Sequence, residues 1–239
     1  MNVVIQLYMY DLHSCTNEYE RARKTMRQQE ISACLALNLR NPLVKSVHAL
    51  IDSEQALVYY QLLAKQVSDK PFVTNLFGRQ PTYRDLMLYI KGAFPDGEII
   101  SLMNCDMFFN SNFSLDFLNQ HLTTTRMFAL TRHELTDENH VTCHDQETCP
   151  FTKCGGSADT FLFRTPIPAQ FPYDSVNHKQ NMFNGEGVFC MAWHRSGIEV
   201  LNPCKQLITV HLHKDRIYFE QYQTVGIPED SFVNLTVIL

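Results

Sequence analysis

Charged side chains are scarce in this sequence, and long apolar runs are missing from it. Asp, Glu, Lys and Arg make up 19% of the 239 residues, against about 25% in an average globular protein. The 20 basic and 25 acidic residues leave a net charge of -5. This balance argues against nucleic acid as the main partner, because a phosphate backbone requires a basic face. A membrane-spanning helix needs an apolar stretch of about 18 residues, and no apolar stretch here is nearly that long, so we expect no membrane span.

Two glycine-rich nucleotide loops are also missing. The first predicted strand is not followed by Gly-x-Gly-x-x-Gly, and the sequence has no P-loop motif. A nicotinamide-dependent oxidoreductase and a P-loop nucleotide hydrolase are therefore not expected. The segment from Met1 to Tyr10 has no basic start, and it is not typical of a secretory signal. We expect a cytoplasmic protein with reduced thiols.

Eight cysteines are present, and four neighbouring Cys and His residues form one loose cluster. The cysteines are at positions 15, 34, 105, 143, 149, 154, 190 and 204. Zinc sites commonly use tight Cys-x₂₋₄-Cys pairs, whereas the gaps here are wider. Zinc binding and free thiols in a long loop both stay open for this cluster, which consists of Cys143, His144, Cys149 and Cys154.

Strand and helix patterns alternate through the first half of the chain. Apolar or β-branched runs predict strands, and segments with helix-favouring residues or an N-terminal cap such as Ser53 predict helices. The predicted strands are Val3–Tyr8, Val44–Ile51, Pro71–Leu76 and Glu98–Met103, and the predicted helices are Glu18–Leu39, Gln55–Ala64 and Thr82–Ala93. This order predicts an α/β fold with a mixed, mostly parallel sheet and helices on both faces.

The second half carries shorter strand-like runs and one helix. The strand-like runs are Met127–Thr131, Thr160–Phe163, Glu199–Leu201 and Ile208–Leu212, and the helix lies near Gly187–Arg195. No linker-like composition separates the halves, so we expect one domain over residues 1–218. The tail, residues 219–239, is expected to pack on the same domain.

Polar residues follow the predicted strand Glu98–Met103. Asn104 and Asp106 are two residues apart, so in an extended chain they face the same side. At the carboxyl end of a parallel strand, Asp106 could hold a divalent cation against a diphosphate. The alternative is an ordinary turn, since Asn and Asp both favour turns.

Two other motifs are candidates for chemistry. His211 and His213 end an apolar strand and face one side, where either imidazole could join Asp106 on Mn²⁺, with Mg²⁺ as a second choice. Glu186 lies between two glycines before a predicted helix, a position that stabilises a carboxylate. Hydrogen-bonded strand histidines and ordinary helix-entry chemistry are the alternatives.

Taken in order, many short motifs resemble one known family. They are Arg27-x-x-Glu30-x-x-x-Cys34-Leu35, Gly78-Arg79-x-x-Thr82-Tyr83-x-Asp85, Asn104-x-Asp106, Leu130-Thr131-Arg132-His133-Glu134, Ser157-x-Asp159-Thr160, Gly197-Ile198-Glu199-Val200-Leu201-Asn202-Pro203 and His211-x-His213. This series resembles the small GT-A-type glycosyltransferase domains of large algal DNA viruses and some bacteria. The resemblance covers residues 3–218, and in a viral protein the location would be the host cytoplasm.

The resemblance implies a sugar transfer from a nucleotide-diphosphate sugar to a hydroxyl of a glycan or glycoprotein. It implies a metal at a DxD-like motif, with Asp106, His211 and His213 as ligands, although Asn104 replaces the first carboxylate. Arg132 and Asp159 would line the sugar or acceptor pocket. The implied donor contacts are Gln6, Asp52, Arg79, Tyr83, Asp85, Asn104, Lys214 and Arg216.

The catalytic base stays open between two carboxylates. Glu186 is the first candidate and Asp159 the second, and one base opposite the leaving group favours inversion. The alternative function is a non-catalytic binding module on the same fold, in which the loop from Cys143 to Cys154 binds zinc or a protein partner. The sequence leaves the oligomeric state open.

Overall fold

The computed structural model describes residues 1–111, 113–135, 141–143, 158–182 and 184–212. Several predictions lie outside these residues: the ligand His213, the donor contacts Lys214 and Arg216, the cluster members His144, Cys149 and Cys154, and the tail.

The centre of the fold is a seven-stranded sheet with the order β10-β6-β9-β4-β1-β2-β3. Only β9 runs against its neighbours β4 and β6; the other pairings are parallel. The strands are β1 (Asn2–Leu7), β2 (Ser46–Ile51), β3 (Phe72–Leu76), β4 (Ile99–Met103), β6 (Arg126–Thr131), β9 (Ala158–Arg164) and β10 (Glu199–Leu201). The predicted α/β class with a mostly parallel sheet is confirmed.

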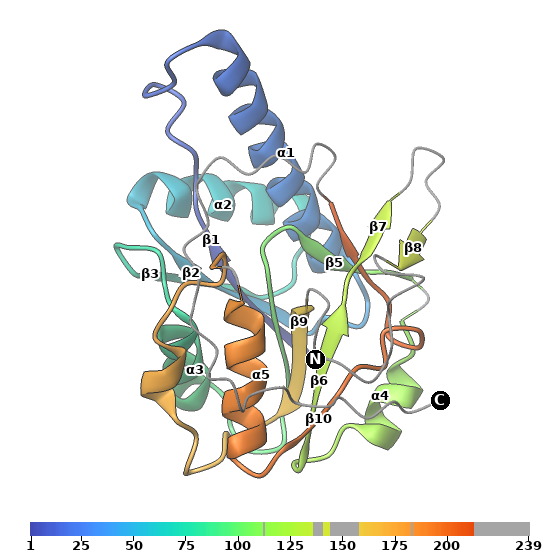
Figure 1. Cartoon of the computed structure of the whole chain (residues 1–239). Helices are drawn as coiled ribbons and strands as arrows, with labels where there is room; N and C mark the ends of the chain where they lie inside the picture. The colour runs from blue at the N-terminus through green and yellow to red at the C-terminus, as the bar shows by residue number, and fades with distance from the viewer. Residues whose placement is uncertain (112, 136–140, 144–157, 183, 213–239) are drawn as a thin grey trace.

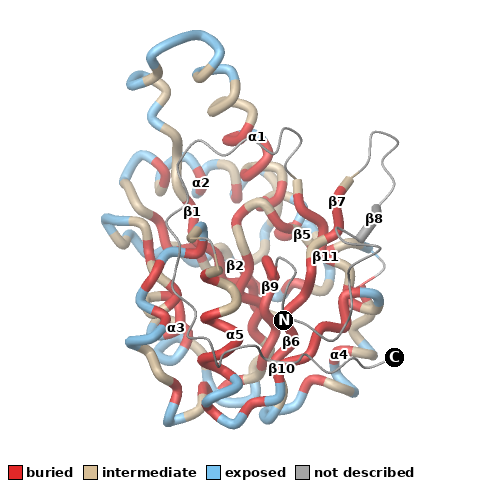
Figure 2. Tube along the Cα trace, in the orientation of Figure 1, coloured by how far each residue is buried: buried red, intermediate tan, exposed pale blue. Residues whose placement is uncertain are grey.

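Helices cover both faces of this sheet (Figure 1). On one face, α1 (Glu18–Arg40), α2 (Glu54–Val67) and α4 (Leu115–His121) share a core with Val3, Ile5 and Leu7 of β1. On the other, α3 (Tyr83–Ala93), the 3₁₀ turn η1 (Tyr173–Val176) and α5 (Gly185–Arg195) pack with Val4. Strand residues alternate between the two cores because successive side chains point to opposite faces. The buried core runs along the sheet (Figure 2).

Local chemistry fixes where the helices begin. The side chains of Asn17 and Ser53 accept hydrogen bonds from the first-turn N–H groups of α1 and α2. Thr82 and Asp85 form a reciprocal capping box at the start of α3, a pairing that satisfies two N–H groups otherwise left without partners. Helix α5 begins two residues earlier than its sequence pattern predicts, after Asn184 in the left-handed conformation with φ 64°.

A second, four-stranded sheet has the order β5-β11-β7-β8. It was not predicted as a sheet, although one of its strands, Thr209–His211, lies within the predicted strand Ile208–Leu212. Its strands are β5 (Met107–Phe109), β7 (His133–Leu135), β8 (Val141–Cys143) and β11 (Thr209–His211). Each has three residues, too few to show a period of two. Because β5 follows β4 and β7 follows β6 after short turns, this sheet lies at the carboxyl edge of the main sheet.

In the part of the chain that the structure describes, no helix is both long enough and apolar enough to cross a bilayer.

Candidate functional site

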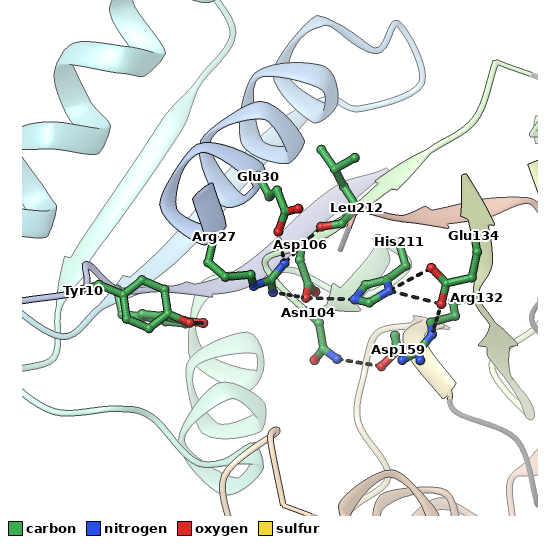
Figure 3. A network of polar contacts seen from close by, with 11 residues as sticks. Tyr10, Arg27, Glu30, Asn104, Asp106, Arg132, Glu134, Asp159, His211 and Leu212 are labelled. Atoms are coloured by element: carbon green, nitrogen blue, oxygen red, sulfur yellow. Dashed lines mark hydrogen bonds and ion pairs between the residues drawn. The ribbon is translucent and has the colours of Figure 1, made fainter. Parts of the chain in front are cut away.

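A continuous series of polar side chains lies where the two sheets meet (Figure 3). Hydrogen bonds and ion pairs join each member to the next, from helix α1 to strand β9. We call it the edge network, and its members in order are Glu30, Arg27, Asp106, His211, Glu134, Arg132, Asp159 and Asn104.

Asp106 stands at the centre of this edge network. It lies in the turn between β4 and β5, and its carbonyl oxygen accepts a hydrogen bond from the N–H of Leu212 at 2.9 Å. Its Oδ2 accepts from Nη2 of Arg27 at 2.6 Å and lies 3.0 Å from Nε2 of His211. Burial alone would raise the pKa of Asp106, but His211 and Arg27 hold it well below its usual range. Asp106 is therefore a carboxylate at neutral pH.

Helix α1 contributes Arg27 from its buried side. The guanidinium donates through Nη1 to Glu30 and to the carbonyl oxygen of Leu212, the latter at 3.1 Å. Arg27 and Glu30 are three residues apart and lie on one helix face. One buried guanidinium thus joins α1 to the turn after β4 and to the residue after β11.

Strand pairing brings His211 and Glu134 together. In the second sheet His211 is the Cα partner of Met107 on one side and of Glu134 on the other. Nδ1 of His211 lies 3.3 and 3.2 Å from the two Glu134 oxygens. Burial lowers the pKa of His211, but Asp106 and Glu134 outweigh burial and raise it well above its usual value.

Asp159 is held on both of its oxygens. Oδ1 accepts from Nδ2 of Asn104 at 2.8 Å, and Oδ2 accepts from Nη1 of Arg132 at 3.2 Å. Its side chain is 5% exposed. Arg132 also donates through Nε to Glu134 at 2.8 Å. The predicted pocket residues Arg132 and Asp159 are therefore neighbours, joined by an ion pair.

The predicted metal can be tested against these contacts. Among the described residues no group of three or more His, Cys, Asp and Glu side chains is arranged to hold an ion. Two predicted ligands do converge, Asp106 and His211, and Glu134 faces the second ring nitrogen of His211, as carboxylates do beside metal-binding histidines. Mg²⁺ and similar cations often take only one or two protein ligands together with phosphate oxygens. The residues thus fit a cation bound jointly with a diphosphate.

Three predicted donor residues carry buried acceptors. Gln6 Oε1, Asp52 Oδ1 and Asn104 Oδ1 have no hydrogen-bond partner within the part of the chain that the structure describes. Each of the three comes two residues after a residue of the α3 and α5 core, and so faces the same side of the sheet. These core residues are Val4, Leu50 and Leu102. Gln6, Asp52 and Asn104 therefore lie on one face, at the carboxyl ends of the adjacent strands β4, β1 and β2. Burial raises the pKa of Asp52.

Three other predicted donor contacts, Arg79, Tyr83 and Asp85, have structural roles. Tyr83 is fully buried and stacks on Phe189 at 4.4 Å, so the structure places it in the core rather than at a ligand surface. It lies there because residue 83 is the first of α3 and faces the sheet. Asp85 accepts bonds from the Thr82 N–H and from both terminal nitrogens of Arg79 at 2.8 to 3.0 Å. Asp85 is therefore a helix cap, and Arg79 is its partner.

Glu186 lies in the first turn of α5 rather than before the helix, because α5 begins at Gly185. The pKa of Tyr83 is raised mainly by burial and, to a smaller extent, by the nearby charges of Glu186 and Asp159. Both candidate bases are thus near the start of α3, at the carboxyl edge of the sheet. Glu186 and Asp159 therefore lie in the same region of the fold.

Sequence reasoning assigned no role to Arg27, Glu30 and Glu134, although all three belong to the motifs of the resemblance. A signal was present for Arg27: it lies four residues before Ile31 and eight before Leu35, on the buried stripe of α1. A charged residue on such a stripe requires a partner. The partners could not be identified, because Asp106 and Leu212 are 79 and 185 residues away.

Comparison with known proteins places the fold. No family model and no curated protein sequence matches the chain. Among solved structures, S. aureus TarS, a glycosyltransferase, is similar with a TM-score of 0.52 and 13% identity over 89% of this chain and 36% of TarS. The fold is GT-A-like.

Two more structures are similar. The TarS 1-349 structure matches with a TM-score of 0.50 and 13% identity, over 88% of this chain and 60% of that one. The inositol-1-phosphate CTP transferase from T. maritima has a TM-score of 0.48 and 9% identity, with 88% of each chain covered. The chain spans about a third of the full TarS chain.

Proposed function

We propose that this protein is a glycosyltransferase that moves a sugar from a nucleotide-diphosphate sugar to a hydroxyl acceptor, with a divalent cation and with inversion. The observation that supports it most is the row of three acceptors at Gln6, Asp52 and Asn104. A buried polar atom without a partner costs about 1–3 kcal/mol. The N–H groups of a base and the hydroxyls of a ribose are donors that would satisfy such a row.

The position of the row supports a nucleotide as the ligand. In open α/β sheets, ligands bind outside the carboxyl ends of the strands. Asn104 belongs both to this row and to the edge network, since its amide nitrogen donates to Asp159 while its oxygen belongs to the row. A nucleoside along the row would therefore direct its diphosphate toward Asp106.

The charge of the edge network explains why a cation is part of the proposal. Four carboxylates face two guanidinium groups and the His211 imidazole along its ion pairs, so negative charge is still in excess. A diphosphate at this place requires additional positive charge. A cation held by Asp106 and His211, and by His213 as predicted, would neutralise the leaving diphosphate. Lys214 and Arg216 remain predicted donor contacts outside the described residues.

Burial and two hydrogen bonds argue against Asp159 as the base, which leaves Glu186 as the candidate. Both oxygens of Asp159 accept charge-assisted or amide hydrogen bonds at 2.8 and 3.2 Å, and its side chain is nearly inaccessible. Both oxygens are therefore already engaged, and the nearly inaccessible side chain is not open to an acceptor hydroxyl. We therefore assign Asp159 to positioning Arg132 and Asn104, and Glu186 to removing the proton from the acceptor hydroxyl.

A binding experiment tests the donor. The full chain would be screened by thermal shift against nucleotide-diphosphate sugars, with Mn²⁺ and with EDTA. We expect one nucleotide class to stabilise the protein with Mn²⁺, and Asp52→Ala to weaken this donor's affinity at least tenfold. Glu199→Ala is the control, because Glu199 lies at the opposite end of the sheet, paired with Arg126. Equal donor affinity in Asp52→Ala and the wild type would refute the nucleotide site.

A transfer experiment tests the chemistry. Glu186→Gln should bind the donor as the wild type does and lose donor hydrolysis and transfer by about 10²–10⁴-fold, the usual contribution of a positioned base. If Asp159→Asn shows this behaviour instead, the assignment of the base is wrong. Donor binding by the wild type without hydrolysis or transfer to any hydroxyl acceptor would favour the non-catalytic binding module.

A further inference from the structure

We propose that Glu134 is a positioning residue that fixes the imidazole of His211, so that Nε2 of His211 faces Asp106 and the cation shared with the donor. This inference rests on the proposed function and deepens it. Glu134 contacts neither the proposed cation nor the donor, and it acts only through His211.

The geometry around His211 carries the inference. Nδ1 lies 3.3 and 3.2 Å from the two oxygens of Glu134, and Nε2 lies 3.0 Å from Oδ2 of Asp106 (Figure 3). A carboxylate accepts hydrogen bonds and does not donate them, so Nδ1 carries a hydrogen. Nε2 is therefore the ring nitrogen whose lone pair is available when a cation replaces its own hydrogen.

Backbone pairing and a second ion pair hold Glu134 in place. His211 and Glu134 are Cα partners in the parallel pair β11 and β7. The Glu134 carboxylate also accepts from Nε of Arg132 at 2.8 Å, and both side chains are 12% exposed. Arg132 in turn binds Asp159. The orientation of His211 is thus fixed by groups on β7 and β9, which lie on the side of the ring opposite Asp106.

This arrangement predicts a specific effect on cation affinity. A carboxylate on the second nitrogen of a metal-binding histidine fixes its tautomer and raises its basicity, and its removal typically costs 10–100-fold in metal affinity. A role restricted to stability would leave the cation affinity of the folded protein unchanged. Cation affinity therefore distinguishes positioning from structure.

The experiment measures Mn²⁺ binding to the full chain by electron paramagnetic resonance, with Mn²⁺ alone and with Mn²⁺ plus excess UDP as the probe nucleotide. Glu134→Ala is expected to raise the Mn²⁺ Kd by 10–100-fold. Glu134→Gln keeps an oxygen that accepts from Nδ1 but loses the charge, so its Kd should lie between those of the wild type and Glu134→Ala. Glu199→Ala and Glu199→Gln are the matched controls and should bind as the wild type does.

The outcomes separate this inference from the proposed function. If Asp106→Asn abolishes Mn²⁺ binding while Glu134→Ala and Glu134→Gln keep the wild-type Kd, the positioning role is overturned and the cation site stands. If Glu134→Ala does not fold, Glu134→Gln decides by itself: a Kd raised at least threefold supports the role, and an unchanged Kd overturns it. If the wild type binds no Mn²⁺ with or without UDP, or if Asp106→Asn binds it unchanged, both the cation site and the role of Glu134 are overturned.

Discussion

Replacing Arg27 with methionine removes one buried charge and takes one ion-pair partner from each of two buried carboxylates, Glu30 and Asp106. Arg27 pairs with Glu30 and with Asp106, and the side chains of Arg27 and Asp106 are 11% and 13% exposed. Methionine fills much of the same volume, so the effect of the substitution reports charge rather than a cavity. The carbonyl oxygen of Leu212 also loses the hydrogen bond from Nη1.

The expected loss of stability follows from burial. Breaking a buried ion pair from one side typically costs about 3–5 kcal/mol, because the remaining charge stays buried without compensation. For a domain of this size, 1 kcal/mol corresponds to roughly 2–4 °C in melting temperature. Arg27→Met should therefore lower the melting temperature by roughly 6–20 °C in the presence of EDTA.

The assay is urea denaturation of the wild type and the variant. Their free energies of unfolding are compared with the same dependence on urea concentration. Arg126→Met is a matched control, since Nε of Arg126 lies 2.7 Å from Glu199 in a pair whose side chains are 34% and 47% exposed. Exposed pairs contribute about 0–1 kcal/mol. Equal losses in the two variants, or a loss below about 1 kcal/mol for Arg27→Met, would refute the reasoning that burial makes this pair important.

Two further substitutions test the fold away from the edge network. Asp85→Ala should destabilise the protein by about 1 kcal/mol at neutral pH by removing the α3 cap. Burial raises the pKa of Asp85, but Arg79 and Thr82 outweigh burial and lower it. The difference in unfolding free energy between wild type and Asp85→Ala should therefore shrink as the pH falls below about 4. A difference that does not change with pH in urea melts would contradict this. Trp193→Ala should cost about 3–5 kcal/mol, because Trp193 is 1% exposed and packs against Phe163 and Phe171; a loss below about 1 kcal/mol by the same assay would show that this core repacks.

Much of the main sheet could be predicted from the sequence because its signals are local. The strand predicted over Val44–Ile51 begins at Ser46, and the helix predicted over Thr82–Ala93 begins at Tyr83 with Thr82 as its cap. Apolar runs, helix caps and their alternation are properties of neighbouring residues. Long elements of this kind are read directly from periodicity.

Most of the second sheet could not be predicted, because its strands are formed by pairing rather than by pattern. Strand β11 lies within the predicted run Ile208–Leu212, but three residues such as His133–Leu135 carry no readable period. They become strands only after β4, β6 and β9 have brought their ends to one edge. The partners of Arg27 belong to the same class of contact, since they come from distant parts of the chain.

The sequence by itself determined the α/β class and pointed to Asn104, Asp106 and His211 at strand ends. Residue type and strand end are local facts, and they sufficed for that, whereas Gln6 and Asp52 followed only from the resemblance. Only the tertiary structure decided which of these groups touch. In the structure, Tyr83 lies in the core and Asp85 caps a helix. Asp106 pairs with Arg27, and His211 pairs with Glu134. These pairings depend on strand register and helix packing between residues far apart in the chain, and no local pattern encodes them.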